Sequence, residues 1–158
     1  MVATEIIPNL WLGDIRSALD TEFLRRNRIG TIINCTTKHP FTKENVEKIR
    51  IELRDRGTED DFNTMYICLV RFVPELYKML RSRKRVYVHC YAGCQRSVTI
   101  IIGFLIKYTD MTLQEIIDTL QSKWDRVGLN FLSSITRYYI AQRDTSDLGF
   151  EYCADTTE

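Results

Sequence analysis

A cysteine and an arginine, Cys90 and Arg96, stand between an apolar segment typical of a strand and a longer apolar segment typical of a helix. The strand-like segment Val86–His89 runs directly into the cysteine, and Gly93 lies within the intervening loop. A loop that runs from a strand into a helix directs successive backbone N–H groups inward, where they can bind an anion. The guanidinium of Arg96 can hold two phosphate oxygens, and the same positive field favours the thiolate of Cys90. The segment therefore predicts a phosphate-binding loop with a nucleophilic thiolate at its floor.

The order of residues in this loop predicts their roles. A thiolate at neutral pH can attack phosphorus in line with the departing oxygen, so Cys90 is the expected nucleophile. His89 is expected to orient the loop through hydrogen bonds, because a preformed thiolate needs no base. Ser97 lies beside the thiolate and is expected to assist its departure in a second step. The residues expected to bind the phosphate of the substrate are Tyr91, Ala92, Gly93, Cys94, Gln95 and Arg96.

The pattern His89-Cys90-x5-Arg96-Ser97 resembles the signature loop of the cysteine-based protein tyrosine phosphatases, and the small dual-specificity branch is the most similar. Segments 7–13 and 129–132 also resemble that branch, at its opening strand and at the start of its last helix. The resemblance covers about residues 5–142. It implies hydrolysis of phosphomonoesters through a cysteinyl-phosphate intermediate, without a metal or other cofactor. Several large DNA viruses encode such enzymes, so a viral origin is one expectation.

The general acid is the part of the resemblance for which the sequence leaves alternatives. The family uses an Asp on a loop after the strand that precedes the signature strand, and the alternating apolar residues of segment 49–53 predict that strand. Asp55 follows this strand at once and is the favoured acid, although its separation from Cys90 is longer than is usual in the family. Asp60 and Asp61 lie nearer the usual spacing but farther from the strand end, so they stay open as alternatives.

Length, charge and cysteine usage narrow the class of protein. The 158 residues suffice for one domain with a hydrophobic core. The 22 basic and 21 acidic residues give a net charge of +1, which favours neither nucleic acid nor a membrane surface as partner. The longest apolar run, 98–106, is too short to span a bilayer, and the five cysteines and two histidines lack metal-type spacing. With no export signal, an intracellular, reducing compartment is expected.

Hydrophobic periodicity predicts an α/β fold, a single domain with a central, mostly parallel sheet that is flanked by helices. Pro74 is expected to kink or break the helix that contains it, and Thr112 and Glu115 form a capping box. The phosphatase domain is expected at 1–143, followed by an acidic and mobile tail at 144–158. Strands are expected at 5–7, 10–12, 29–34, 49–53 and 86–89, and helices at 21–27, 43–48, 63–81, 98–106, 113–124 and 129–142.

Three functions stay open. The resemblance favours a phosphatase that acts on phosphotyrosine, and also on phosphoserine and phosphothreonine, in protein substrates. Removal of phosphate from RNA 5′ ends is an alternative performed by some relatives of this fold, but positions 91, 92, 94 and 95 of the loop carry no Lys or Arg. The third function is a phosphate-binding module with little turnover. The presence of Cys90, which such a module does not need, favours catalysis.

Overall fold

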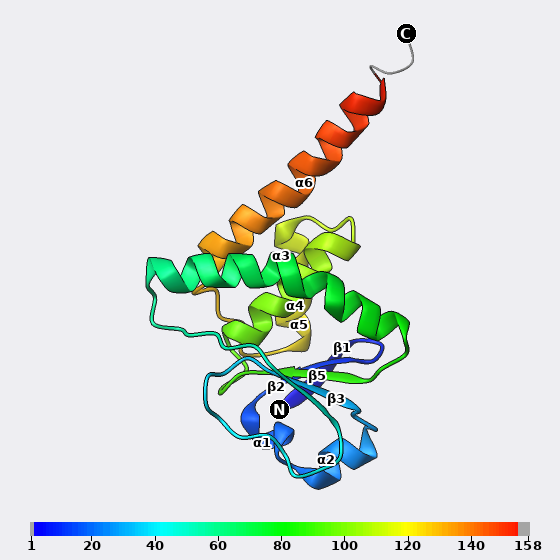
Figure 1. The fold of residues 1–158 in the computed structure, drawn as a ribbon, viewed down its shortest axis with the longest axis vertical. Helices are drawn as coiled ribbons and strands as arrows, with labels where there is room; N and C mark the ends of the chain where they lie inside the picture. The colour runs from blue at the N-terminus through cyan, green and yellow to red at the C-terminus, as the bar shows by residue number, and fades with distance from the viewer. Residues whose placement is uncertain (1, 155–158) are drawn as a thin grey trace.

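The computed structural model describes residues 2–154, with the side chains of residues 2–144. Within that part of the chain the strands form one sheet, in the order β1-β2-β5-β3-β4 (Figure 1). β1 is antiparallel to β2, and every other pair of neighbours is parallel. The mostly parallel α/β sheet predicted from the sequence is confirmed. The strands are β1 (Ala3–Ile7), β2 (Leu10–Gly13), β3 (Thr31–Asn34), β4 (Glu47–Arg50) and β5 (Val86–His89).

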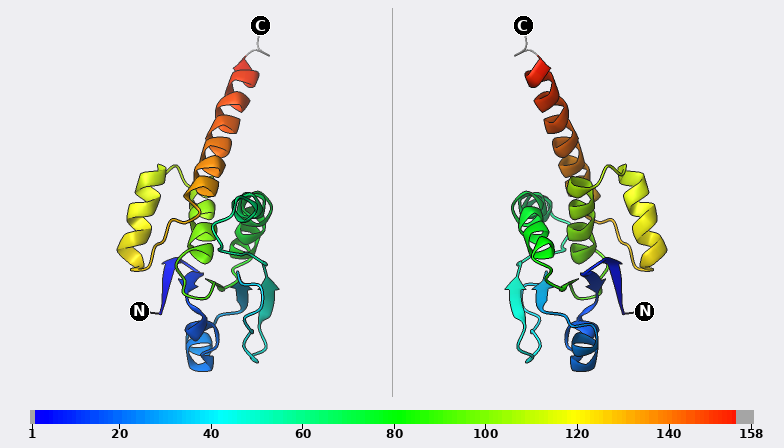
Figure 2. Two further views of the ribbon diagram at one scale, coloured as in Figure 1. Left: turned by 90° about the vertical axis from the view of Figure 1, so that its left-hand side faces the viewer. Right: turned by 90° about the vertical axis from the view of Figure 1, so that its right-hand side faces the viewer.

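Helices cover both faces of the sheet, as the sequence predicts (Figure 2). Two short helices lie on one face, and four longer helices lie on the other. The short helices are α1 (Ile15–Ala18) and α2 (Thr21–Arg26), and the long helices are α3 (Glu59–Arg81), α4 (Arg96–Tyr108), α5 (Leu113–Lys123) and α6 (Leu132–Ala154).

The central strand β5 is buried on both faces. Val86 and Val88 lie in the larger hydrophobic cluster, which also holds side chains of α3, α4, α5 and α6. Tyr87 points to the opposite face and packs in a smaller cluster against Phe23, with ring centroids 5.6 Å apart. Since successive side chains of a strand alternate between faces, the two clusters fix β5 from both sides. The residue that follows β5 is Cys90.

The prediction of a helix at 43–48 is wrong. Residues 43–46 form bends, and β4 begins at Glu47, whose backbone N–H donates to the carbonyl of Gly30 at 2.9 Å. Pairing with the neighbouring strand β3 overrides the local helix propensity of this segment. The strand expected at 49–53 accordingly begins earlier and ends at Arg50, so that residues 51–53 leave the sheet.

The remaining helices follow the predicted pattern with shifted ends. α3 begins before the expected residue because the Thr58 hydroxyl accepts a hydrogen bond from the backbone N–H of Asp61, and it bends while continuing through Pro74 (Figure 1). The capping box at the start of α5 is confirmed. α6 begins at Leu132 and continues past residue 142, where its end was expected. Side chains beyond residue 144 lie outside the described part, so the mobile tail and the boundary at 143 stay predictions.

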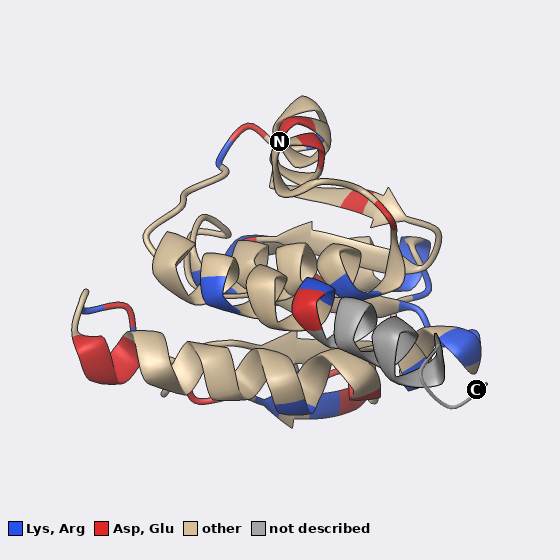
Figure 3. Cartoon of the chain, turned by 90° about the horizontal axis from the view of Figure 1, so that it is seen from above, with Lys and Arg blue, Asp and Glu red and all other residues tan. Residues whose placement is uncertain are grey.

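Charged residues of both signs are spread over the described elements, and the first turn of α3 is acidic (Figure 3). Among the described residues, no helix is both long and apolar enough to cross a bilayer.

Asp61 in the first turn of α3 is only 4% exposed and accepts hydrogen bonds from the backbone N–H and the guanidinium of Arg56, at 2.8 and 2.7 Å. The bond from the guanidinium is the main cause that lowers the pKa of Asp61 to about 2. These bonds from Arg56 to Asp61 therefore hold the segment before α3 against the first turn of the helix.

We expect Asp61→Asn to lower the melting temperature at pH 7, because the pairing of a charged carboxylate with Arg56 is lost. The folded pKa of Asp61 lies below its ordinary value of 3.8, so this stabilisation is present above about pH 4 and is lost as the pH falls through about 2. Thermal unfolding of both proteins between these limits should show melting temperatures that converge as the pH falls. A difference that stays constant over the range would contradict this assignment.

Candidate active site

The loop of residues 90–95 leaves the carboxyl end of β5 and enters α4 at Arg96. Gly93 within it has a φ of +70°, a left-handed conformation that side chains disfavour. A Cβ at this position would lie 2.7 Å from the carbonyl oxygen of Gly13 in the neighbouring strand β2. Both the tight turn and the close approach to β2 therefore require glycine here.

The thiol of Cys90 lies at the floor of this loop and is 3% exposed. Its Sγ is 3.2 Å from the hydroxyl oxygen of Ser97, which is buried in the first turn of α4. Burial raises the pKa of Cys90, but hydrogen bonds from the hydroxyl and backbone N–H of Ser97, the charge of Arg96 and the N–H of Gly93 lower it by more. The net shift is downward, which favours the thiolate that a nucleophile needs.

The imidazole of His89 is fully buried beside the loop. Burial lowers the pKa of His89 to about 4, so the ring is neutral at pH 7. Nδ1 lies 2.9 Å from the carbonyl oxygen of Cys90, and because a carbonyl can only accept, Nδ1 carries the proton and donates it. This contact is to the backbone and not to the sulfur, which suits the orienting role expected from the sequence.

The guanidinium of Arg96 lies between the loop and the segment that follows β4. Nη1 donates to the carbonyl oxygen of Leu53 at 3.1 Å, and Leu53 is 1% exposed. Nε is buried and has no hydrogen-bond partner among the described residues. Since buried N–H groups are normally paired, this donor suits an anionic ligand at the loop.

Residues of the loop line a pocket of about 210 Å³, and the favoured acid, Asp55, lines it as well. Asp55 is exposed on the segment after β4, so its carboxyl group can meet a bound substrate. Asp60 and Asp61 do not line this pocket, and Asp61 is already bound by Arg56. The residues that line the pocket are Asp55, Cys90, Tyr91, Ala92, Cys94, Gln95 and Arg96.

The side chains of the loop point in different directions. Tyr91 is 57% exposed, and its ring stacks on that of His39 with centroids 4.9 Å apart. The thiol of Cys94 lies 3.6 Å from the carbonyl oxygen of Ala92, and burial raises its pKa. The amide oxygen of Gln95 accepts from the backbone N–H of Asn130 at 2.9 Å. Gln95 is thus engaged away from the thiol, so its expected part in phosphate binding falls to its backbone.

A second pocket of about 240 Å³ adjoins the first at Tyr91 and Ala92. Its basic side chains Arg16 and Arg126 both contact the carboxylate of Asp14, at 2.7 and 3.3 Å. Burial raises the pKa of Asp14, but the arginines and the N–H of Ser17 lower it by more, so the carboxylate stays charged at neutral pH. Part of the positive charge of this pocket is therefore neutralised internally.

Sequence reasoning missed the residues that contact the loop from outside. The backbone N–H of Ile15, at the start of α1, donates to the carbonyl of Tyr91 at 3.1 Å. Further donors come from Trp124, Arg126 and Gly128, between α5 and α6. These residues are far from the loop in the sequence and share no periodic pattern with it, so only the fold reveals them.

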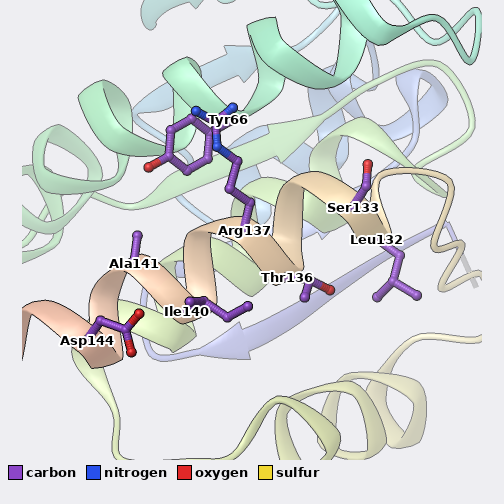
Figure 4. Close-up of a pocket in the computed structure, with 8 residues that line it drawn as sticks. All are labelled: Tyr66, Leu132, Ser133, Thr136, Arg137, Ile140, Ala141 and Asp144. Carbon is purple, nitrogen blue, oxygen red and sulfur yellow. The ribbon is translucent and has the colours of Figure 1, made fainter.

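A larger hollow of about 850 Å³ lies against α6 and shares no lining residue with the pocket at Cys90 (Figure 4). Its walls include the exposed side chains of Leu132 and Ile140. Arg137 stacks over the ring of Tyr66, 3.8 Å from the centroid, as Figure 4 shows. None of the residues predicted to bind phosphate lines this hollow.

Comparison with known proteins agrees with this geometry. A family model for the catalytic domain of dual specificity phosphatases matches residues 10–141. Dual specificity protein phosphatase 16 from Homo sapiens is 33% identical over 131 residues, which cover 81% of this chain and 19% of that protein. Dual specificity protein phosphatase 13B from Mus musculus is 33% identical over 127 residues, which cover 77% of this chain and 64% of that protein. The chain thus spans less than two thirds of the length of these relatives.

Solved structures share the fold. Human DUSP28 is similar with a TM-score of 0.80 at 20% identity, over 90% of this chain and 96% of that chain. The structure of DUSP15 is similar with a TM-score of 0.75 at 20% identity, over 92% of this chain and 95% of that chain. The family model covers most of the chain, including β5, the loop at Cys90 and α4. This chain therefore belongs to the dual specificity phosphatase family, of which it contains the catalytic domain.

Proposed function

We propose that this chain hydrolyses phosphotyrosine, phosphoserine and phosphothreonine in protein substrates. The observation that carries the proposal is one pocket that holds the thiol of Cys90, the guanidinium of Arg96 and the carboxyl group of Asp55. Two-step hydrolysis of a phosphomonoester needs a nucleophile, a group that binds the phosphate and a proton donor, all close to the same phosphoryl group. Membership of the dual specificity family supports a phosphorylated protein as substrate.

In the first step the thiolate of Cys90 attacks phosphorus and the bond to the leaving oxygen breaks. Asp55 gives its proton to that oxygen, so the dephosphorylated side chain leaves as a neutral hydroxyl group. The inward N–H groups of the loop and the guanidinium of Arg96 bind the three non-bridging oxygens, where charge is spread in the transition state. Cys90 then carries the phosphoryl group.

In the second step a water molecule attacks the phosphoryl group on Cys90. Asp55, now a carboxylate, accepts a proton from that water, and the bond between phosphorus and sulfur breaks. The hydroxyl of Ser97, 3.2 Å from the sulfur, stabilises the departing thiolate. Inorganic phosphate is released and both side chains regain their starting states, so water is the only co-reactant.

The alternatives named from the sequence fit the pocket less well. A 5′ end of RNA with several phosphates would meet Arg16 and Arg126, whose charge is partly neutralised by Asp14. A binding module without turnover would need neither the thiolate of Cys90 nor the carboxyl group of Asp55. An intracellular, reducing compartment would keep the thiolate active; that compartment and a viral origin stay predictions.

Cys90→Ser should abolish hydrolysis of a phosphotyrosine peptide and leave peptide binding in place. A serine hydroxyl stays protonated at neutral pH, whereas the N–H groups of the loop do not depend on the sulfur. Phosphate release measures the first effect and titration calorimetry the second. Normal turnover by a folded Cys90→Ser variant would refute the thiolate route.

Asp55→Asn should reduce kcat on a phosphotyrosine peptide by about 10²–10⁴, because the leaving oxygen loses its proton donor. The loss should be much smaller for an aryl phosphate whose leaving group departs as an anion. The matched control is Asp60→Asn, which removes an exposed carboxyl group outside the pocket and should leave kcat unchanged. If Asp60→Asn loses the rate and Asp55→Asn retains it, the acid is assigned to the wrong residue.

A further inference from the structure

The segment of residues 124–130, here named the strap, connects α5 to α6 (Figure 2). It donates hydrogen bonds to three successive carbonyl oxygens of the loop. The bonds run from Nη1 of Arg126 to Ala92 at 3.1 Å, from Nε1 of Trp124 to Gly93 at 2.7 Å and from the backbone N–H of Gly128 to Cys94 at 2.8 Å.

These bonds determine which way the N–H groups of the loop point. In a trans peptide the carbonyl and the following N–H point in opposite directions, and the described chain contains no cis peptide. Because Arg126 holds the carbonyl of Ala92 outward, the N–H of Gly93 turns inward, and this N–H is among the groups that lower the pKa of Cys90. By the same geometry, the bond from Trp124 to the carbonyl of Gly93 turns the N–H of Cys94 inward.

Trp124 joins the strap to the loop most closely. Its side chain is 1% exposed, and its ring would lie 3.1 Å from a Cβ placed on Gly93. The guanidinium of Arg126 lies over the same ring, 4.6 Å from the centroid, so Trp124 also supports the neighbouring bond. Hydrogen bonds between buried groups are stronger than exposed ones because no water competes for them.

The strap also contacts the side chain of Gln95, the last residue of the loop. The backbone N–H of Asn130 donates to the amide oxygen of Gln95. Gly128 leaves the space that this amide occupies, since a Cβ at residue 128 would overlap the end of the Gln95 side chain. Strap and loop are therefore complementary in shape as well as in hydrogen bonds.

We propose that Trp124 and Arg126 are positioning residues: they hold the carbonyls of Gly93 and Ala92 outward and so keep the N–H groups of the loop directed at the substrate phosphate. The proposal rests on the proposed function for its substrate, but its test uses inorganic phosphate and the reactivity of Cys90. Neither readout requires turnover. A failure of the phosphatase proposal is therefore distinguishable from a failure of this one.

The test is the alkylation of Cys90 by iodoacetamide, followed by mass spectrometry of its peptide, as a function of pH and of inorganic phosphate concentration. In Trp124→Phe the ring is kept and the N–H donor is lost. We expect the phosphate concentration that halves the alkylation rate to rise about tenfold, the effect of one lost buried hydrogen bond. The alkylation profile should also move to higher pH, because a less ordered loop stabilises the thiolate less.

The matched control is Trp11→Phe, since Nε1 of Trp11 is buried and has no partner among the described residues. This variant should match the wild type in both measurements. A folded Trp124→Phe that also matches the wild type would overturn the proposal.

A second pair of variants decides the matter if circular dichroism shows Trp124→Phe unfolded. Arg126→Gln removes the donor to Ala92, and Arg16→Gln removes an equal charge from the same Asp14 without a bond to the loop. We expect Arg126→Gln to weaken protection by phosphate several-fold more than Arg16→Gln does. Equal protection in the two variants would overturn the proposal.

Discussion

The site depends on hydrogen bonds that keep the carbonyl groups of residues 90–95 pointing away from the phosphate-binding centre. A ring of N–H groups attracts phosphate only while the carbonyl oxygens of the same peptides point away, because an inward oxygen would repel the anion. Each carbonyl of this loop has a donor outside the ring, so no peptide is free to turn over. In loop order the donors are Nδ1 of His89, the N–H of Ile15, Nη1 of Arg126, Nε1 of Trp124, the N–H of Gly128 and the N–H of Thr99.

These donors come from separate elements, which explains why the whole fold is needed for so short a loop. β5, α1, α4 and the strap each supply at least one, and β2 approaches so closely that residue 93 must be glycine. The proposed acid, Asp55, is also connected to the loop through the backbone. Arg96 bonds the carbonyl of Leu53, and Leu53 stands just before Asp55 in the segment that leaves β4. The arginine and the proposed acid are thus positioned by one piece of backbone.

The loop and the sheet could be predicted from the sequence because their signals are local. Cys90, Arg96 and Ser97 lie within one short segment, and the short apolar run that precedes them is typical of a buried strand. The helix expected at 43–48 failed because β4 is an edge strand with half-exposed residues, and pairing with β3 decided its conformation.

The other parts of the site depend on side-chain contacts that no sequence pattern predicts. The sequence could not decide among Asp55, Asp60 and Asp61, because the bond that occupies Asp61 comes from the side chain of Arg56. The strap was missed for a similar reason. A tryptophan at the end of an amphipathic helix predicts core packing, and only the fold brings Trp124 within 2.7 Å of the loop.

Cys90 should carry the phosphoryl group during turnover, and trapping that intermediate would show it. The wild type would be mixed with an aryl phosphate, quenched rapidly in denaturant and digested for mass spectrometry. We predict one phosphoryl group on the peptide that contains Cys90, formed before inorganic phosphate reaches its steady rate. Steady release of phosphate with Cys90 unmodified at every time, or a phosphoryl group on another residue, would contradict it.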